Sequence, residues 1–325
     1  MSAPRHQMVP PGEAGYFHCI SRCVRRAFLC GQDTYTGQSF DHRKQWIEDR
    51  LYQLANIFAV GVYAYAVMSN HVHVVAHVNP GVAASWSADE VAERWLRLCP
   101  VRSGSEIDLA ASAIKASHIA ADPAKVAIYR ERLASLPWFM RCLNEPIARR
   151  ANREDACTGR FWEGRYRCQA LLDETALLAC MTYVDLNPIR AGIASDLPSS
   201  RHTSICRRLQ HVGSRALLEP IAGHPTHALS MSVTDYVKLV EWTGARRRMD
   251  CRAPHFGDPP TVLRSLGMTP ESWHAEVFTI ESRYWRAVGS VEALINKARD
   301  LGQRWLKGGG LKRLCRSRVR STVAA

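Results

Sequence analysis

Two adjacent apolar segments constrain the fold of this chain more than any other feature. Residues 59–68 and 71–78 are rich in Val, Ala and Tyr, and a Ser-Asn turn signal at 69–70 separates them. Pro80 follows the second segment and ends it. Two such runs joined by so short a turn predict neighbouring strands of one sheet.

Further segments add one more strand and several helices. Residues 16–22 have the length and aromatic content of a strand, and residues 39–57 carry apolar side chains near helical spacing. Ser87 and Asp173 are good helix N-caps, and Pro188 follows the helix that Asp173 begins. The sequence therefore predicts a mixture of strands and helices.

Changes in composition divide the chain into four parts. Residues 1–14 form a polar, proline-bearing lead, and a boundary is predicted near residue 200. Residues 201–306 are mostly helical by pattern. Residues 307–325 form a basic tail, with six cations and no acid up to Arg320. This tail is interpreted as a sequence-independent electrostatic arm, with a plain solvated tail as the alternative.

The charge of the chain favours polyanionic partners. Its 325 residues include 43 Lys and Arg against 30 Asp and Glu, which gives a net charge of +13. Nucleic acid is the first candidate partner and an anionic membrane the second, with a merely soluble basic protein as the alternative. The longest apolar run, 57–68, is shorter than the roughly 20 residues that span a bilayer. The first residues lack the apolar core of a signal peptide, so a cytoplasmic protein is expected.

Eleven cysteines occur without any Cys-x-x-Cys pair. In a cytoplasmic protein they are interpreted as reduced thiols, most of them small core residues. A zinc site built from Cys19, Cys23 and Cys30 is the alternative, but their spacing differs from that of common zinc modules.

His71 and His73 form the first chemical constellation. Side chains two apart in a strand lie on one face with their Cα atoms about 6–7 Å apart, so both imidazoles can meet one divalent cation. His77 shares this face but lies about 13 Å away, too far to bind the same ion. The alternative is a pair of ordinary polar residues on an exposed strand face.

Tyr183 and Asn187 form the second constellation, four residues apart and thus on one face of the helix that Asp173 begins. A tyrosine with its ordinary pKa near 10 is a poor nucleophile unless a metal polarises the phosphate that it attacks. Two imidazoles and an amide oxygen suit Mg²⁺ or Mn²⁺, although these ligand types also accept zinc. The attack would yield a covalent phosphotyrosine. The alternative is a core aromatic followed by a helix-terminal amide.

Basic and aromatic residues alternate in the glycine-punctuated segment 158–169. In such a mixture the cations bind backbone phosphates and the aromatic rings stack on unpaired bases. The alternative is that the rings of Phe161 and Trp162 pack inward as part of a structural loop. The arginines are interpreted as phosphate contacts. The candidate DNA-binding residues are Arg22, Arg160, Arg165, Arg167 and Arg190.

Four blocks of the sequence, in this order, resemble the single-tyrosine HUH transposases, in particular the REP-associated tyrosine transposase branch with its IS200-like domain. The similarity covers residues 15–200 and does not extend to the rest. The blocks are YFHCISR at 16–22, MSNHVH at 68–73, GRFWE at 159–163 and YVDLNPIRAG at 183–192.

The resemblance implies an α+β fold with a ferredoxin-like antiparallel sheet and packed helices, followed by a mainly helical C-terminal region. It implies that Tyr183 is the nucleophile, that His71 and His73 bind the metal, and that Asn187 takes the place of the family's amide ligand. Two features depart from the compact members. The separation of 110 positions between His73 and Tyr183 indicates a helical insertion at about 80–135, and the part after residue 200 has no counterpart.

The leading prediction is therefore a bacterial, nucleoid-associated transposase without a membrane partner. It would bind single-stranded or hairpin DNA, then cleave and rejoin it through a 5′-phosphotyrosine at Tyr183. Two alternatives are a non-catalytic hairpin-binding regulator and a metal-dependent nuclease that uses water. Whether the chain acts as a monomer or a homodimer is left open.

Overall fold

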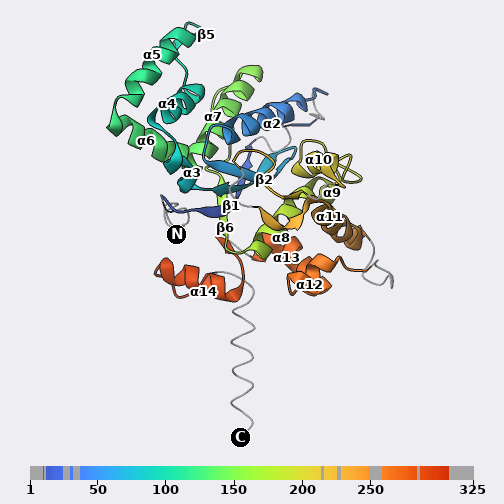
Figure 1. Ribbon diagram of the computed structural model, residues 1–325. Coiled ribbons are helices and arrows are strands. Elements are labelled where there is room, and N and C mark those ends of the chain that lie inside the picture. Colours follow the sequence, from blue (N-terminus) through green and yellow to red (C-terminus); the bar gives the residue numbers. More distant parts are fainter. Residues whose placement is uncertain are drawn as a thin grey trace.

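The computed structural model of the chain describes residues 10, 12–24, 30–31, 37–213, 216–224, 228–248, 258–283 and 286–306 (Figure 1). The predicted basic tail lies outside these residues, and so does most of the predicted lead. None of the described helices is both long enough and apolar enough to cross a bilayer.

A five-stranded sheet lies at the centre of the molecule, which is an α+β protein as predicted. Its strands are β1 (Gly15–Arg22), β2 (Val60–Val67), β3 (His71–Val78), β6 (Arg167–Leu171) and β9 (Ala287–Val288). Their order is β2-β3-β1-β6-β9, and the three pairs that the first four strands form are antiparallel. Only the last pair, β6 and β9, is parallel. The predicted neighbouring strands are confirmed as β2 and β3.

The two faces of the sheet differ because successive side chains of a strand point to opposite sides. In β3 every even-numbered residue is apolar, whereas three of the four odd-numbered residues are histidines. In the register of β1 on β3, Ile20 lies opposite His73 and Arg22 opposite His71. The even-numbered residues of β1, including His18, therefore share the side of these histidines, which we call the histidine face.

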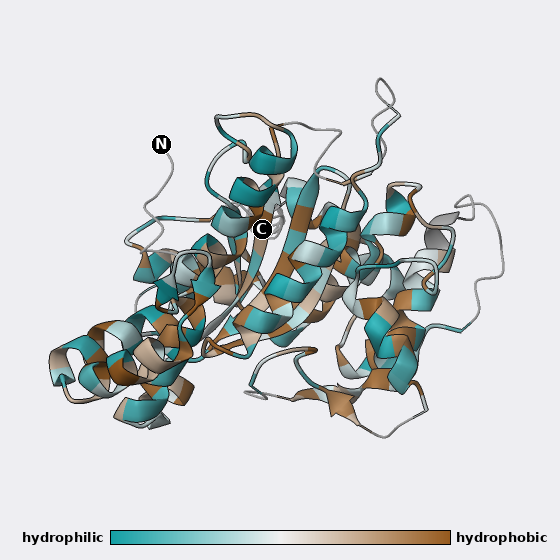
Figure 2. Ribbon diagram, turned by 90° about the horizontal axis from the view of Figure 1, so that it is seen from above, coloured by the Kyte–Doolittle hydropathy of each residue, from teal (hydrophilic) through white to brown (hydrophobic). Residues whose placement is uncertain are grey.

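The other side, the apolar face, is covered by α2 (His42–Ala55) and α7 (Leu136–Glu154) (Figure 1). From α7, Asn144 donates a hydrogen bond of 2.8 Å to Ser21 Oγ of β1, on the side opposite His18. The helix ribbons in Figure 2 carry both hydrophilic and hydrophobic residues, as expected where one side of a helix packs against a core.

The histidine face is covered by α8 (Glu174–Asp185) and α13 (Pro270–Arg283), which pack against each other. On this face β2 presents Ala64 and Ala66, the latter opposite His73. Such small side chains let a helix approach a sheet closely, and α8 contacts both β2 and β3. Asp173 caps α8 as predicted, its carboxylate accepting a hydrogen bond from the Ala176 amide at 2.8 Å.

Between β3 and α7 the chain forms a helical layer over the range of the predicted insertion. Ser87 caps one of its helices as predicted, accepting a hydrogen bond from the Glu90 amide at 3.1 Å. The layer consists of α3 (Pro80–Ser85), α4 (Ala88–Leu98), β4 (Arg102–Ser103), β5 (Glu106–Ile107), α5 (Leu109–Ala120) and α6 (Pro123–Leu133).

The region after residue 200 is mainly helical and packs against the part that precedes it. Its strand β9 extends the central sheet, and its helix α13 covers α8. The domain boundary near residue 200 stays a prediction. The remaining elements after α8 are α9 (Asn187–Arg190), α10 (Ser204–Arg208), the 3₁₀ turn η1 (Leu209–His211), β7 (Leu217–Leu218), β8 (Leu229–Ser232), α11 (Val233–Arg248), α12 (Thr261–Ser265) and α14 (Val291–Asp300).

A buried carboxylate, Glu48 of α2, ties α2 to β2 and to the start of α10. It accepts hydrogen bonds from the Tyr65 hydroxyl at 2.5 Å, from His202 Nδ1 at 2.8 Å and from Arg207 Nη2 at 3.3 Å. Burial alone would raise the pKa of Glu48. The hydrogen bonds outweigh burial, so the pKa lies below its ordinary value of 4.5.

We expect Glu48→Gln to lower the free energy of unfolding by about 2 kcal/mol near neutral pH, because hydrogen bonds to a charged acceptor are lost. The folded-state pKa lies below the unfolded value, so this contribution is complete above pH 4.5 and is lost as the pH falls below it. Urea unfolding of both proteins at about pH 7 and about pH 3.5 measures the difference. The difference in the free energy of unfolding between the two proteins should be smaller at the lower pH. A difference that does not change with pH would contradict the prediction. Asp49→Asn, at the exposed neighbouring position, is the control.

Candidate functional site

A polar cluster lies between the histidine face and the helices that cover it. Its centre is the fully buried His73, whose ring centroid is 4.7 Å from that of His71, 5.2 Å from that of His18 and 5.9 Å from that of Tyr183. The side chain of Asn187 also reaches His73, with Nδ2 at 2.9 Å from Nε2. The structure thus brings together the predicted nucleophile and all three predicted metal ligands. We call these five residues the histidine cluster.

The strand geometry accounts for the two histidines of β3. Their positions two apart put both rings on the histidine face, with an angle of 74° between the ring planes. His77, farther along the same face, stacks instead on the ring of Tyr16 with centroids 4.2 Å apart. His77 therefore takes part in a separate contact, as predicted from its distance along the strand from His73.

Asn187 reaches the cluster by a route that differs from the prediction. It does not belong to the helix of Tyr183, since α8 ends at Asp185 and Asn187 begins α9. The break is slight because Leu186 keeps helical backbone angles, with φ −84° and ψ −6°. Asn187 therefore still follows Tyr183 by about one turn, and both side chains point toward His73.

The end of α8 is held in place by a second buried carboxylate. Asp185 accepts hydrogen bonds from the Ser204 hydroxyl, from the Ile205 amide at 2.9 Å and from the Tyr236 hydroxyl at 2.6 Å. Burial raises the pKa of Asp185 to about 6, against the opposing effect of these donors. The contacts link α8 to α10 and α11 next to the histidine cluster.

The imidazoles of the cluster are neutral near pH 7. Burial lowers the pKa of His18 to about 4, and burial together with the charge of Arg22 lowers that of His71 to about 4. Burial and the neighbouring imidazoles place the pKa of His73 well below its ordinary value. Neutral imidazoles keep the lone pairs that metal ligation requires.

Tyr183 is a protonated phenol under the same conditions. Burial raises its pKa to about 12, and the nearby carboxylate of Glu281 adds to this effect. Arg190 acts in the opposite direction, with its guanidinium carbon 4.3 Å from the centroid of the Tyr183 ring. A nucleophilic Tyr183 therefore needs a group that accepts its proton.

The donor set fits a divalent metal ion. Within the described part of the chain, no group of three or more His, Cys, Asp or Glu side chains could hold an ion. A metal site here would therefore need the Asn187 amide beside His71 and His73. His71 Nδ1 donates a hydrogen bond of 2.5 Å to Asn70 Oδ1, which leaves the Nε2 lone pair free. Asn187 Nδ2 lies 2.9 Å from His73 Nε2, and rotation of the amide would put Oδ1 in its place. Adjacent donors around an octahedral ion with bonds of about 2.1 Å are separated by about 3 Å.

Three residues near His73 were not predicted to act there. His18 of β1 lies in a recognised block but received no role, and Gln169 of β6 lies beside it in the register of the sheet. The third is Glu281 of α13, whose Oε1 is 4.0 Å from His73 Nδ1. Once the order of the strands is known, their pairing places His18 and Gln169 near His73. No local sequence pattern indicates Glu281.

The predicted DNA-binding arginines differ in their surroundings. Arg22 is exposed at the end of β1 beside His71, and Arg167 is exposed at the start of β6. Arg160 and Arg165 are exposed on the loop before β6, whereas Arg190 is half-buried against Tyr183. Four of the five guanidinium groups are therefore accessible to a polyanion.

The aromatic rings of the same loop pack inward. Phe161 and Tyr166 are buried, and the indole N–H of Trp162 donates a hydrogen bond of 2.9 Å to the carbonyl oxygen of Asn144. The alternative that these rings pack inward is therefore confirmed, and they do not form a surface on which bases could stack. Their burial fixes the loop that carries the exposed arginines.

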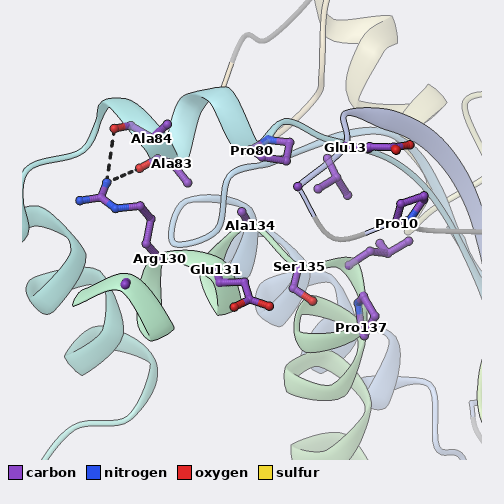
Figure 3. Close-up of a pocket in the computed structure, with 14 residues that line it drawn as sticks. Pro10, Glu13, Pro80, Ala83, Ala84, Arg130, Glu131, Ala134, Ser135 and Pro137 are labelled. Atoms are coloured by element: carbon purple, nitrogen blue, oxygen red, sulfur yellow. Dashed lines mark hydrogen bonds between the residues drawn. The ribbon is translucent and has the colours of Figure 1, made fainter. Parts of the chain in front are cut away.

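A cavity of about 410 Å³ lies at the other end of β3, where the helical layer meets the sheet (Figure 3). Its wall is mainly apolar, and Arg130 closes one side by donating hydrogen bonds to the carbonyl oxygens of Ala83 and Ala84. None of the predicted site residues lines this cavity, which is separate from the histidine cluster.

Comparison with known proteins leaves the function to be argued from this geometry. No protein-family model matches the chain, and no curated protein is similar to it in sequence. A solved structure of a REP-associated tyrosine transposase bound to a REP hairpin superimposes on 68% of this chain and 92% of that chain. The identity is 11% and the TM-score is 0.31, which is too loose a match to establish a shared fold.

We expect Asp185→Ala to lower the free energy of unfolding by about 3 kcal/mol, because three buried donors lose their acceptor. Chemical denaturation followed by circular dichroism measures this. Asp89→Ala, at an exposed position in the first turn of α4, is the control and should change stability by less than about 0.5 kcal/mol. Equal effects of the two substitutions would contradict the anchoring role of Asp185.

Proposed function

We propose that this protein is a transposase that cleaves and rejoins single-stranded or hairpin DNA, with Tyr183 as nucleophile. The observation that carries the proposal is the distance of 5.9 Å between the ring centroids of Tyr183 and His73. A phosphate bridged by one metal ion spans this separation. The neutral imidazoles and the Asn187 amide provide the donors for that ion beside the phenol.

The proposed chemistry is a transesterification. An Mg²⁺ or Mn²⁺ ion held by His71, His73 and Asn187 would polarise the scissile phosphate and stabilise the charge that develops on it. Tyr183 Oη bonds to phosphorus as the bond from phosphorus to the 3′ oxygen breaks, and the departing 3′ oxygen takes up a proton from solvent, which yields a 5′-phosphotyrosine and a free 3′-OH. We assign the phenol proton to Glu281, whose carboxylate interacts with the Tyr183 hydroxyl.

The charge distribution supports DNA as the substrate. Arg22 lies beside His71 in the register of the sheet, and Arg167 is exposed on β6. With Arg160 and Arg165 on the preceding loop, these residues offer phosphate contacts close to the proposed cleavage site. The binding they provide is independent of sequence, so hairpin recognition would come from shape.

We further propose that the first four strands form a ferredoxin-like unit. The succession β1-α2-β2-β3-α7-β6 with strand order β2-β3-β1-β6 is the arrangement that this fold requires. Both crossover helices, α2 and α7, lie on the apolar face (Figure 1). The helical layer α3–α6 is then an insertion ahead of the second crossover helix.

An adduct assay tests the proposed function. The protein is incubated with labelled single-stranded hairpin DNA and Mn²⁺ or Mg²⁺, then separated on a denaturing gel. We expect a metal-dependent band shifted by the mass of the protein, because the phosphotyrosine bond survives denaturation. Tyr183→Phe and His71→Ala should lose this band, and the control Tyr129→Phe, in the helical layer, should retain it.

The same assay separates the alternatives. Cleavage without an adduct that persists in Tyr183→Phe would indicate water as the nucleophile and thus a hydrolytic nuclease. Hairpin binding that needs no metal and gives neither cleavage nor adduct would indicate a regulator. Sedimentation of the protein with and without hairpin DNA decides between a monomer and a homodimer.

A further inference from the structure

A line of hydrogen bonds runs behind His73 through four elements of the fold. His73 Nδ1 on β3 is 2.9 Å from His18 Nε2 on β1, and His18 Nδ1 is 3.1 Å from Gln169 Oε1 on β6. Gln169 Nε2 then donates to the main-chain carbonyl oxygen of Ile280 on α13 at 3.5 Å. All three side chains have an exposed fraction of 0%, so water does not compete for these contacts.

The last acceptor sets the direction of every donor in the line. A carbonyl oxygen only accepts, so the Gln169 amide nitrogen faces Ile280 and its oxygen faces His18. That oxygen accepts a proton from His18 Nδ1, which leaves His18 Nε2 as an acceptor. His73 Nδ1 must then carry the proton of that ring, and its lone pair lies on Nε2.

The other end of the line is compatible with this direction. His73 Nε2 lies 2.9 Å from the amide nitrogen of Asn187, which can donate to it. Because the Asn187 amide can also turn its oxygen toward His73, this contact does not fix the tautomer by itself.

We propose that His18 and Gln169 are positioning residues that hold His73 in the Nδ1-protonated tautomer and direct its Nε2 lone pair toward Asn187. A neutral imidazole without such partners exchanges between two tautomers, and only one of them presents an acceptor at Nε2. The metal that Nε2 would bind is part of the proposed function, and in that respect this proposal rests on it. The tautomer of His73 does not depend on the proposed function.

This arrangement also gives a role to the region after residue 200. The carbonyl group that fixes the line belongs to α13, which is held against β6 by a second contact, from Arg167 Nη2 to the Glu281 carbonyl oxygen at 3.1 Å. The C-terminal region thus orients a side chain on β3 through this line of hydrogen bonds. Partners of this kind raise metal affinity by about 10–100-fold.

Nitrogen NMR of the metal-free full chain tests the tautomer directly. With ¹⁵N-labelled histidine, two-bond correlation spectra distinguish a protonated Nδ1 from a protonated Nε2, and the variant His73→Gln assigns the His73 signals. We expect wild-type His73 to be protonated on Nδ1. An Nε2-protonated His73, or rapid exchange between the two forms, would overturn the proposal without any variant of His18.

Two substitutions at His18 test its role. His18→Gln keeps an acceptor near the position of Nε2 and should preserve the tautomer of His73, whereas His18→Leu should release it. Calorimetric titration with Mn²⁺ should show about 10–100-fold weaker binding to His18→Leu and a change below about 3-fold in His18→Gln. An unchanged tautomer and affinity in His18→Leu would also overturn the proposal.

Further variants separate a loss of folding from a loss of orientation. Gln169→Leu leaves both histidines in place and should release the His73 tautomer as His18→Leu does. His77→Gln, on the same strand but outside the line, should leave the tautomer unchanged. If the tautomer is fixed as expected but no DNA adduct forms in any assay, the proposed function fails while the positioning role of His18 stands.

Discussion

The nitrogens of buried imidazoles need hydrogen-bond partners, and this requirement determines the geometry of the site more than any other. His73 lies in the centre of a sheet with no exposed surface, where an unpaired polar group costs several times the net gain of a typical hydrogen bond. Its two nitrogens are satisfied from opposite sides, by His18 in the sheet and by Asn187 above it.

The charges around the cluster are compatible with the phosphodiester that the proposed function requires. The imidazoles are neutral, and the carboxylate of Glu281 is accompanied by the guanidinium groups of Arg22 and Arg190. An ion bound by neutral ligands keeps its full charge, which strengthens its effect on a bound phosphate. In the proposed reaction the burial of Tyr183 adds a requirement, because a phenol whose pKa is raised to about 12 must lose its proton before it can attack.

Local signals in the sequence account for much of the fold and for part of the site. Strand alternation placed His71 and His73 on one face, and Asp173 marked the start of α8. The contacts of His18 were not predicted because they join residues 55 and 151 positions apart in the chain. Such pairings depend on the strand order, which a single sequence does not reveal. Similarly, Asn187 lies outside the helix of Tyr183 because Pro188, which has no N–H to continue α8, lies in the first turn of α9.

The location of α13 has a consequence for protein synthesis. Domains generally begin to fold as the chain emerges from the ribosome, N-terminal parts first. All strands of the histidine cluster emerge before α13, which begins at Pro270 and carries both the carbonyl group that fixes Gln169 and the carboxylate beside Tyr183. A nascent or prematurely terminated chain would thus hold the histidines and the tyrosine without the groups that orient and deprotonate them. Under the proposed function, the order of synthesis would keep unfinished copies from cutting the DNA from which they are being expressed.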